Sequence, residues 1–376
     1  MQRTIPCMII RGGTSKGLYF LESDLPPAGE ERDRVLLKLM GSPDKRQVDG
    51  LGGAMSVTSK VAIVAPSNQA GIDVNYTFAQ IAVDKPVVSY LGNCGNISSG
   101  VGPFAIESAL VKAHSPSTKV RIFNTNTQKL IVEEIETPGG TVNYDGDYEI
   151  PGVPGSAAPI KIIVQDPAGS ICGSLLPTGN AIDELAIPDF GKLKVSIVDA
   201  TNPLVFVMAT DIGMSGKEKP EEIDAKPPLL AFLEQIRAQA AQTLGFVEQL
   251  TESASKSPTV PKLTIIAPSG EYTSVSGETI AAQRMDILGR MMSMQRTHPT
   301  YALTGAMCTA VAAAIPGTLV HSIRSAEANL QRFRIAHPGG IIEAGVEYRN
   351  SGGEFTILNA FGYRTARLLM KGTAYY

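Results

Sequence analysis

Short segments rich in β-branched and other apolar residues run along most of the chain, and turns rich in Gly, Pro and Asn separate them. This pattern predicts many short β-strands with a few inserted helices. The segments expected to form strands are residues 4–10, 60–66, 73–83, 86–90, 119–127, 129–136, 160–166, 194–200, 204–210, 263–268, 333–338 and 354–362.

Helices are expected where apolar residues recur with a period near 3.6 or where Ala, Leu and Glu dominate. Residues 30–40 begin with acidic side chains, carry their apolar residues on one side and are followed by Gly41. These features predict a helix that ends at a glycine C-cap. Further helices are predicted at residues 97–113, 220–250, 277–293 and 304–314.

The strand pattern starts again near Lys192, after a first half with the same mixture of strands and helices. The turn-rich segment 177–191 is therefore the expected boundary, which gives an N-terminal domain of residues 1–185 and a C-terminal domain of residues 186–376. A chain of this length suits two domains of ordinary size. The predicted fold class is α+β, with two similar halves and an active site between them.

The low charge content predicts a large buried interior. Hydrophobic residues make up 43% of the chain and charged residues 18%, against a usual share of roughly 25%. The net charge is −3 without a basic block, which argues against nucleic acid and membranes as partners. No segment resembles a signal peptide or a membrane span, so we expect a soluble cytoplasmic protein. The low charge content also leaves apolar surface for subunit contacts, so we expect a homo-dimer or tetramer.

The cysteines and histidines do not suggest a metal site. Cys7, Cys94, Cys172 and Cys308 form no Cys-x-x-Cys pair, and in a cytosolic protein they are expected to be reduced thiols. The four histidines, among them His298 before a proline, show no ligand spacing with the cysteines. Acidic pairs at metal-binding spacing are also absent from the sequence, so we predict no metal.

Cys94 stands in the turn Asn93-Cys94-Gly95-Asn96, after an expected strand and before an expected helix. Unpaired N–H groups and the macrodipole at a helix N-terminus stabilise an anion, so Cys94 is a candidate base or nucleophile. The same N–H groups, with the amides of Asn93 and Asn96, can bind a substrate carboxylate. The alternative is a buried cysteine without a chemical role.

Lys60 directly precedes the apolar run 61–65, where partial burial would lower its pKa and suit a general base. The alternative is a solvated lysine at a strand edge. The segment 11–17 is a turn dense in donors, but its order departs from a phosphate-binding P-loop because Ser15 precedes Lys16. Its N–H groups and hydroxyls suit a carboxylate, and the alternative is a tight turn that only requires glycine.

In the second half, the segment 304–309 opens an Ala-rich helix and again places a cysteine, Cys308, near a helix start. Two interpretations stay open for this segment, a second anion-binding turn and a thiol that is simply packed.

Taken together, these motifs resemble the PrpF family, which contains methylaconitate isomerases, methylitaconate Δ-isomerases and 4-oxalomesaconate tautomerases. The resemblance covers essentially the whole chain, and the stretches NYTFAQ, RIFNTNT and SIVDATNP are most similar to the methylitaconate Δ-isomerases of that family. The most specific blocks are residues 11–17, 41–53, 58–60, 92–107, 177–180, 315–318 and 364–370.

The resemblance implies the diaminopimelate epimerase-like fold, in which each of two similar domains wraps a curved sheet around a helix. It implies a site without a cofactor, with Lys60 and Cys94 as the catalytic pair. The substrate-binding positions that it implies are Thr14, Ser15, Asn93, Asn96, Thr304 and Gly305. Related epimerases carry a second catalytic cysteine in a Cys-Gly-Thr/Ser setting, but Cys308 precedes Thr309 and Ala310, so it is not assigned as a catalytic acid.

The resemblance also implies an isomerase that shifts a C=C bond by 1,3-allylic proton transfer in a small unsaturated di- or tricarboxylate. Methylitaconate, methylaconitate and 4-oxalomesaconate are the candidate substrates. Which of Lys60 and Cys94 is the base and which the acid stays open, because both forms of the pair hold the same number of protons. The alternatives are a cofactor-independent amino-acid epimerase, which would need a second thiol, and a non-catalytic carboxylate-binding protein, which would tolerate loss of Cys94.

Overall fold

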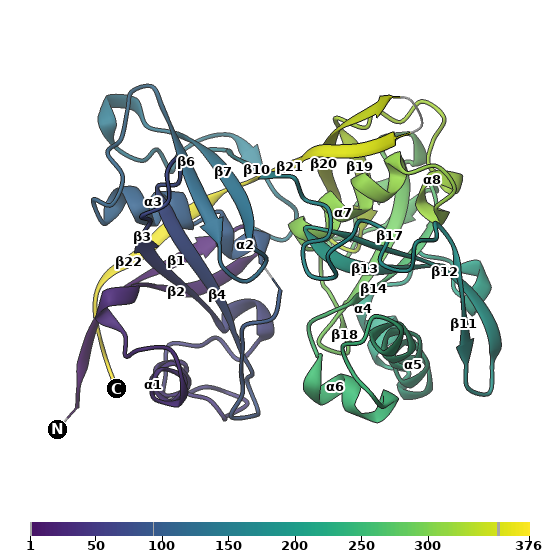
Figure 1. The fold of residues 1–376 in the computed structure, drawn as a ribbon, viewed down its shortest axis with the longest axis horizontal. Helices are drawn as coiled ribbons and strands as arrows, with labels where there is room; N and C mark the ends of the chain where they lie inside the picture. The colour runs from purple at the N-terminus through teal and green to yellow at the C-terminus, as the bar shows by residue number, and fades with distance from the viewer. Residues whose placement is uncertain (1, 93, 352–353) are drawn as a thin grey trace. The chain divides into compact units, whose positions relative to one another are not determined.

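The computed structural model describes residues 2–92, 94–351 and 354–376, and the chain forms two compact units (Figure 1). Unit 1 comprises Met1–Ile163 and Tyr363–Tyr376, and unit 2 comprises Val164–Gly362. This division differs from the single predicted boundary after residue 185. The chain enters unit 2 earlier, and its C-terminal segment returns to unit 1 because the last strand pairs with the first strand.

Unit 1 is built on a mixed sheet in the order β22–β1–β2–β3–β4–β6–β7. Its strands are β1 (Thr4–Gly12), β2 (Ser15–Leu21), β3 (Lys60–Pro66), β4 (Val74–Ile81), β5 (Val88–Ser89), β6 (Ser117–Asn124), β7 (Lys129–Glu136) and β22 (Ala366–Tyr375). Two shorter strands, β8 (Tyr148–Glu149) and β9 (Ser156–Ala157), form a separate pair, and β10 (Ile160–Gln165) follows them.

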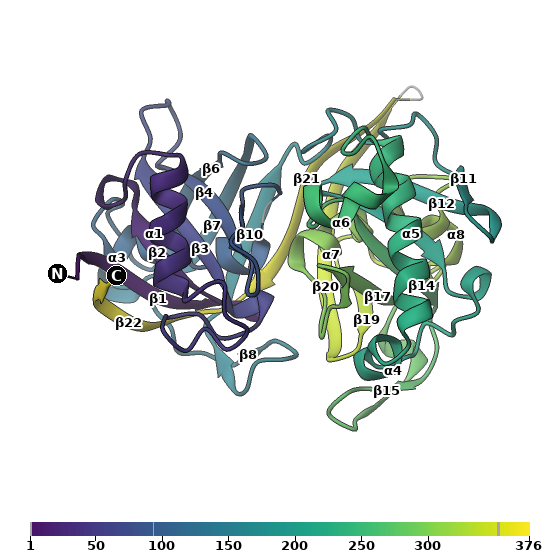
Figure 2. The ribbon, with the colours of Figure 1, turned by 90° about the horizontal axis from the view of Figure 1, so that it is seen from below.

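Helices cover both faces of this sheet. On one face lies α1 (Glu30–Met40) (Figure 2). It buries Leu36 and Leu39 against strand residues such as Ile63. It ends at Gly41 in the left-handed conformation, so the predicted helix and its C-cap are confirmed.

On the other face, two short helices, α2 (Gly95–Ser98) and α3 (Val101–Glu107), replace the single helix predicted at 97–113. The helix is interrupted at Gly100, which packs against the ring of Tyr19: a Cβ there would lie 2.4 Å from the Tyr19 hydroxyl oxygen. Close packing on the sheet therefore requires a glycine between the two helices.

Unit 2 repeats the plan with the strand order β11–β12–β13–β14–β17–β19–β20–β21. Its strands are β11 (Asp183–Ile187), β12 (Gly191–Ala200), β13 (Asn202–Met208), β14 (Lys262–Pro268), β15 (Tyr272–Thr273), β16 (Thr279–Ile280), β17 (Ile287–Ser293), β18 (Arg296–Thr297), β19 (Phe333–His337), β20 (Gly340–Ser351) and β21 (Glu354–Arg364). Its helices are α4 (Pro220–Asp224), α5 (Pro227–Thr243), α6 (Ser253–Lys256), α7 (Leu303–Ala314) and α8 (Leu319–Ile323).

The longest helix of unit 2 is α5 (Figure 2). It packs Leu233, Ile236 and Ala240 into the core of the unit. The helix α7 is buried along its whole length and contacts β12, β13 and β20. Both helices were predicted, although the segment 220–250 contains α4 as well as α5.

The helix predicted at 277–293 is wrong. This segment contains β16 and then β17, which lies between β14 and β19 and is buried along nearly its whole length. A strand covered on both faces lacks the alternation of apolar and polar residues, so its Leu and Met residues resemble a buried helix. The neighbouring strands, which a single segment cannot reveal, decide its conformation.

The two sheets share one succession of pairings. From β1 to β7, neighbouring strands pair antiparallel, parallel, antiparallel, parallel and antiparallel. The same succession holds from β12 to β20. The prediction of an α+β chain with two similar halves is therefore confirmed.

Candidate active site

Lys60 and Cys94, predicted from separate motifs, lie together in unit 1. Lys60 is the first residue of β3, and Cys94 is the N-cap residue of α2. The Nζ of Lys60 lies 3.2 Å from the Sγ of Cys94. An amine and a thiol at this distance can exchange a proton and can act on the same bound molecule.

The sheet and its turn position the two side chains. The parallel register of β2 and β3 sets Lys60 beside Gly17, and the hydroxyl of Tyr19 donates to the carbonyl oxygen of Ile97 at 2.6 Å, which holds α2 against β2. Gly12 allows α2 to approach β1, because a Cβ at this position would lie 2.2 Å from the carbonyl oxygen of Asn96. The cysteine therefore reaches the lysine through contacts between segments that are distant in sequence.

The surroundings of Cys94 favour its thiolate. Burial alone would raise the pKa of this thiol, but the ammonium of Lys60 and hydrogen bonds from the backbone N–H groups of Ile97 and Asn96 outweigh it. The pKa of Cys94 is consequently lower than that of an ordinary thiol. Lys60 also makes a cation–π contact, with its Nζ 5.5 Å from the centroid of the Phe78 ring.

The turn between β1 and β2 joins the same site. The Nδ2 of Asn96 donates to the Oγ1 of Thr14 at 3.0 Å. Ser15 is 2% exposed, and among the described residues its hydroxyl has no hydrogen-bond partner. Such a buried hydroxyl costs about 1–3 kcal/mol, which a ligand oxygen would offset. Asn93, also predicted as a ligand, lies outside the described residues.

A buried arginine that the sequence analysis did not assign completes this arrangement. The Nε of Arg364 donates to the Oδ1 of Asn96 at 2.8 Å. The two residues are 268 positions apart, so no local pattern could connect them. The available signal was an arginine that opens the block 364–370 between two strand-like segments.

The remaining predicted ligand residues, Thr304 and Gly305, lie in the first turn of α7 in unit 2 and are buried. The Oγ1 of Thr304 accepts a hydrogen bond from the Nδ2 of Asn202 at 3.2 Å, and its carbonyl oxygen accepts one from the Oγ1 of Thr201 at 2.6 Å. These contacts fix the start of α7 within unit 2. A role of either residue toward a ligand stays a prediction.

Cys308 has the opposite environment to Cys94. It lies inside α7 with 0% exposure, and its thiol donates to the carbonyl oxygen of Val198 at 3.4 Å. Burial, together with the nearby carboxylate of Asp199, raises the pKa of this thiol despite hydrogen bonds from the backbone. A buried thiol of this kind has the character of a packed side chain.

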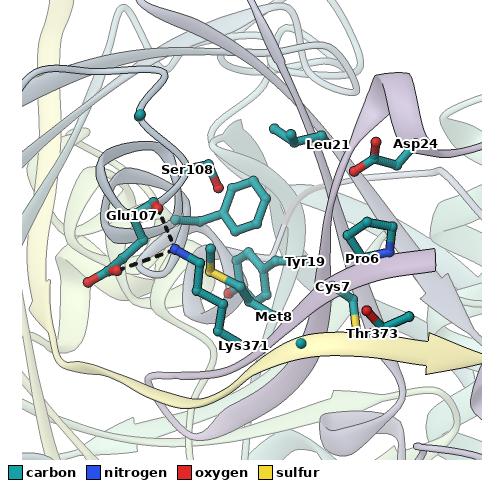
Figure 3. A pocket seen from close by; sticks show the side chains of 13 residues that line it. Pro6, Cys7, Met8, Tyr19, Leu21, Asp24, Glu107, Ser108, Lys371 and Thr373 are labelled. Carbon is teal, nitrogen blue, oxygen red and sulfur yellow. Dashed lines mark hydrogen bonds and ion pairs between the residues drawn. The ribbon is translucent and has the colours of Figure 1, made fainter.

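Unit 1 also contains a cavity of about 490 Å³, and none of the predicted site residues that the structure describes lines it (Figure 3). Its wall includes Cys7, Phe104 and Lys371, and the ammonium of Lys371 lies 3.9 Å from a carboxylate oxygen of Glu107. Within the described ranges, no group of His, Cys, Asp and Glu side chains is arranged to hold a metal ion. None of the helices in those ranges combines the length and the apolar character of a membrane span.

Comparison with known proteins assigns a family. A family model described as PrpF protein matches residues 2–376. The chain is 44% identical over 375 residues to a 3-methylitaconate isomerase of Eubacterium barkeri, and the match covers 100% of this chain and 97% of the relative. It is 38% identical over 384 residues to a 2-methyl-aconitate isomerase of Shewanella oneidensis, with 99% and 96% covered.

Solved structures agree on the fold. The crystal structure of a methylitaconate-delta-isomerase matches with a TM-score of 0.81 and 44% identity, over 100% of this chain and 96% of that one. A hydroxyproline epimerase from Agrobacterium vitis matches with a TM-score of 0.55 and 10% identity, over 100% and 94% of the two chains. The second likeness shows the fold alone. Together they confirm the predicted epimerase-like fold.

Proposed function

The chain belongs to the PrpF family and is an isomerase that shifts a double bond in a small carboxylate, and we propose that Lys60 and Cys94 perform its proton transfers. The observation that carries this proposal is the distance of 3.2 Å between the amine of Lys60 and the thiol of Cys94. A base and an acid held side by side can remove a proton from one carbon and return a proton two carbons away.

The lowered pKa of Cys94 supports a resting pair of thiolate and ammonium. In this form the thiolate is the base, and it takes a proton from the carbon next to the double bond. The electron pair left behind spreads as a dienolate onto the substrate carboxylate. Lys60 then gives a proton to the far end of this system, and a proton passes from the thiol to the amine to restore the pair.

We propose a substrate with at least two carboxylates, such as methylitaconate. The 44% identity to a 3-methylitaconate isomerase supports this choice. The cations of Lys60 and Arg364 support an anionic ligand, as does the hydroxyl of Ser15, which has no hydrogen-bond partner among the residues that the structure describes. Thr14, Ser15, Asn93 and Asn96 of unit 1, with Thr304 and Gly305 of unit 2, are its proposed binding residues. Proton transfer between these side chains requires no cofactor.

The amino-acid epimerase alternative needs a second thiol that can accept or donate a proton. Cys308 is the thiol that the sequence offered for this role, and it is fully buried with a raised pKa. The likeness to a hydroxyproline epimerase, at 10% identity, shows the fold alone. The observations therefore favour the double-bond isomerase.

Proton NMR in D₂O with methylitaconate, methylaconitate and 4-oxalomesaconate tests the proposal. We expect migration of the double bond with deuterium uptake in one of them, and a loss of about 10²–10⁴-fold in rate for Cys94→Ser. Cys172→Ser is the matched control, because burial and the neighbouring carboxylate of Asp199 raise the pKa of this thiol and disfavour its thiolate, and we expect it to retain the rate. Full activity of Cys94→Ser, or deuterium uptake only at an amino-acid α-carbon, would contradict the proposal.

We also propose a homo-oligomer in the cytoplasm, as the low share of charged residues suggested. Exposed apolar side chains such as Phe190 and Leu369 support further contacts between copies. Static light scattering of the purified chain tests the assembly, and the mass of a single chain would contradict it.

A further inference from the structure

Arg364 is a buried cation beside the candidate catalytic pair. It is 4% exposed and lies where the chain has returned from unit 2 to unit 1. Its Nε donates to the Oδ1 of Asn96 at 2.8 Å, and its Nη1 donates to the carbonyl oxygen of Tyr363 at 2.9 Å. Placing a guanidinium away from water is costly, so its presence here calls for a role.

Asn96 connects Arg364 to the rest of the site. This side chain is 3% exposed, accepts from Arg364 through its Oδ1 and donates through its Nδ2 to the Oγ1 of Thr14. The backbone N–H of Asn96 is one of the groups that lower the pKa of Cys94. A change in the position of Asn96 would therefore alter both its hydrogen bond to Thr14 and the pKa of the Cys94 thiol.

The turn between β1 and β2 is shaped around this contact. Gly13 adopts φ +51°, and a Cβ on it would lie 2.2 Å from the Oδ1 of Asn96 and 2.9 Å from the Cδ of Arg364. A residue with a side chain at position 13 would displace the hydrogen-bonded pair. Arg11 holds the neighbouring backbone, since its Nη1 donates to the carbonyl oxygens of Gly13 and Thr365, both at 3.0 Å.

Arg364 and Cys94 also interact through their charges. Burial lowers the pKa of Arg364 to about 10, while the Tyr148 phenolate and the Cys94 thiolate would raise it. An interaction between two titrating groups acts on both, so the guanidinium favours the thiolate as the thiolate favours the guanidinium. At neutral pH the arginine stays charged.

We propose that Arg364 is a positioning residue that fixes Asn96 against the β1–β2 turn and thereby keeps Cys94 in its reactive state. The inference rests on the proposed role of Cys94. It assigns to the returning C-terminal segment a part in the chemistry of unit 1, beyond closing the sheet. A guanidinium suits this place because its rigid fork can donate to Asn96 and to the backbone at once, which an ammonium on a flexible chain does less well.

The test measures the thiol directly and needs no substrate. The rate at which iodoacetamide alkylates Cys94, followed by mass spectrometry of its peptide, is recorded against pH for the wild type, Arg364→Met, Arg364→Lys and Arg367→Met. Arg367 lies three positions further on β22 and is exposed, so it is the matched control. Melting curves establish that each variant is folded.

In Arg364→Met we expect the midpoint of alkylation to move upward by roughly half a pH unit or more, and kcat to fall about 10- to 100-fold with a smaller change in KM. Arg364→Lys keeps the charge and loses the fork, so its profile should lie between those of the wild type and Arg364→Met. Arg367→Met should leave the profile and kcat unchanged.

An alkylation profile of Arg364→Met that superimposes on the wild-type profile overturns the inference. If Arg364→Met does not fold, Arg364→Lys decides, and a wild-type profile and kcat in that variant overturn the positioning role. Failure of the proposed function is recognised separately, because Cys94→Ser would then retain turnover whatever the Arg364 variants do to alkylation.

Discussion

In each unit, one strand that has a parallel neighbour begins with a lysine, and the two lysines have different hydrogen-bond partners. Lys60 opens β3 and Lys262 opens β14, in the segments KVAIVAP and KLTIIAP. In the sheets, β3 lies between its parallel partner β2 and its antiparallel partner β4, and β14 lies between its parallel partner β13 and its antiparallel partner β17. Lys60 contacts the thiol of Cys94, whereas the Nζ of Lys262 donates to the carbonyl oxygen of Thr259 at 2.8 Å.

The helices that follow explain the difference. In unit 1 the N-cap residue of α2 is Cys94, and in unit 2 the N-cap residue of α7 is Ala302. The thiol of unit 2, Cys308, lies further along α7 and is fully buried. The same scaffold therefore occurs twice, but a cysteine stands at the helix start only in unit 1. The fold supplies the same position in both units, and in unit 1 a side chain suited to proton transfer occupies it.

Substitution of the two cysteines tests the difference between the units most directly. Cys94→Ser removes the thiolate, and we expect kcat to fall about 10²–10⁴-fold. Cys308→Ala should keep kcat within about threefold, because this thiol is packed, while removal of its buried sulfur lowers the melting temperature. Turnover assays and thermal melts of both variants check this, and an equal loss of kcat in the two would refute the asymmetry.

The two lysines should differ in their effect on Cys94. In Lys60→Met the attraction that lowers the thiol pKa is lost while burial remains, so the pKa of Cys94 should rise and its alkylation at pH 7 should slow about tenfold or more. Activity should fall at least as far. Lys262→Met is the control, and its alkylation profile should match the wild type.

The sign of the pH dependence follows from the same interactions. A thiol whose pKa is lowered by folding stabilises the protein at high pH, and this contribution is lost as the pH falls through the folded-state pKa. As the pH falls through that pKa, the melting temperature of the wild type should therefore fall more than that of Cys94→Ser. An identical pH dependence in both proteins would show that Cys94 is not shifted.

The approach of α2 to the sheet can be tested through Gly12. A Cβ at this position would meet the backbone oxygen of Asn96, which cannot move without shifting the helix. Gly12→Ala should therefore reduce kcat about 10- to 100-fold, because small displacements of a catalytic group are costly. Gly372→Ala is the matched control on β22, where the nearest atom is the Sδ of Met370 at 3.1 Å, part of a flexible side chain. Equal kcat in both variants would contradict this.

A smaller effect, on the free energy of unfolding, is expected from substitution of Glu133, whose carboxyl group accepts a hydrogen bond at the start of α3. Its Oε2 accepts from the N–H of Gly102 at 2.9 Å, and burial raises the pKa of this carboxyl well above its ordinary value despite that bond. A raised carboxyl pKa makes stability fall as the pH rises above the unfolded-state pKa. Glu133→Gln should remove this loss, worth about 1 kcal/mol or more at pH 8. Thermal melts from pH 5 to pH 8 check it, and a constant gap between variant and wild type would contradict it.

The sequence allowed prediction of elements that have local signals. The helix at 30–40 was identified because acidic residues, one-sided apolar residues and a glycine cap agree along a single segment. The prediction of a helix at 277–293 was wrong because β17 is buried on both faces, and its sequence therefore lacks the alternation of apolar and polar residues that identifies a strand. Local signals made Cys94 and Lys60 candidates, and the resemblance to a family paired them, but their contact involves two segments 34 residues apart.

The sequence by itself determined many of the strands, the main helices and the candidate residues for proton transfer, because these depend on periodicity, caps and side-chain chemistry. Only the tertiary structure decided that Lys60 contacts a thiol whereas Lys262 donates to a carbonyl oxygen, and that Arg364 donates to Asn96. Those contacts arise from strand register and from helices packed on a sheet. Register and packing join residues far apart in the chain, and no local pattern records them.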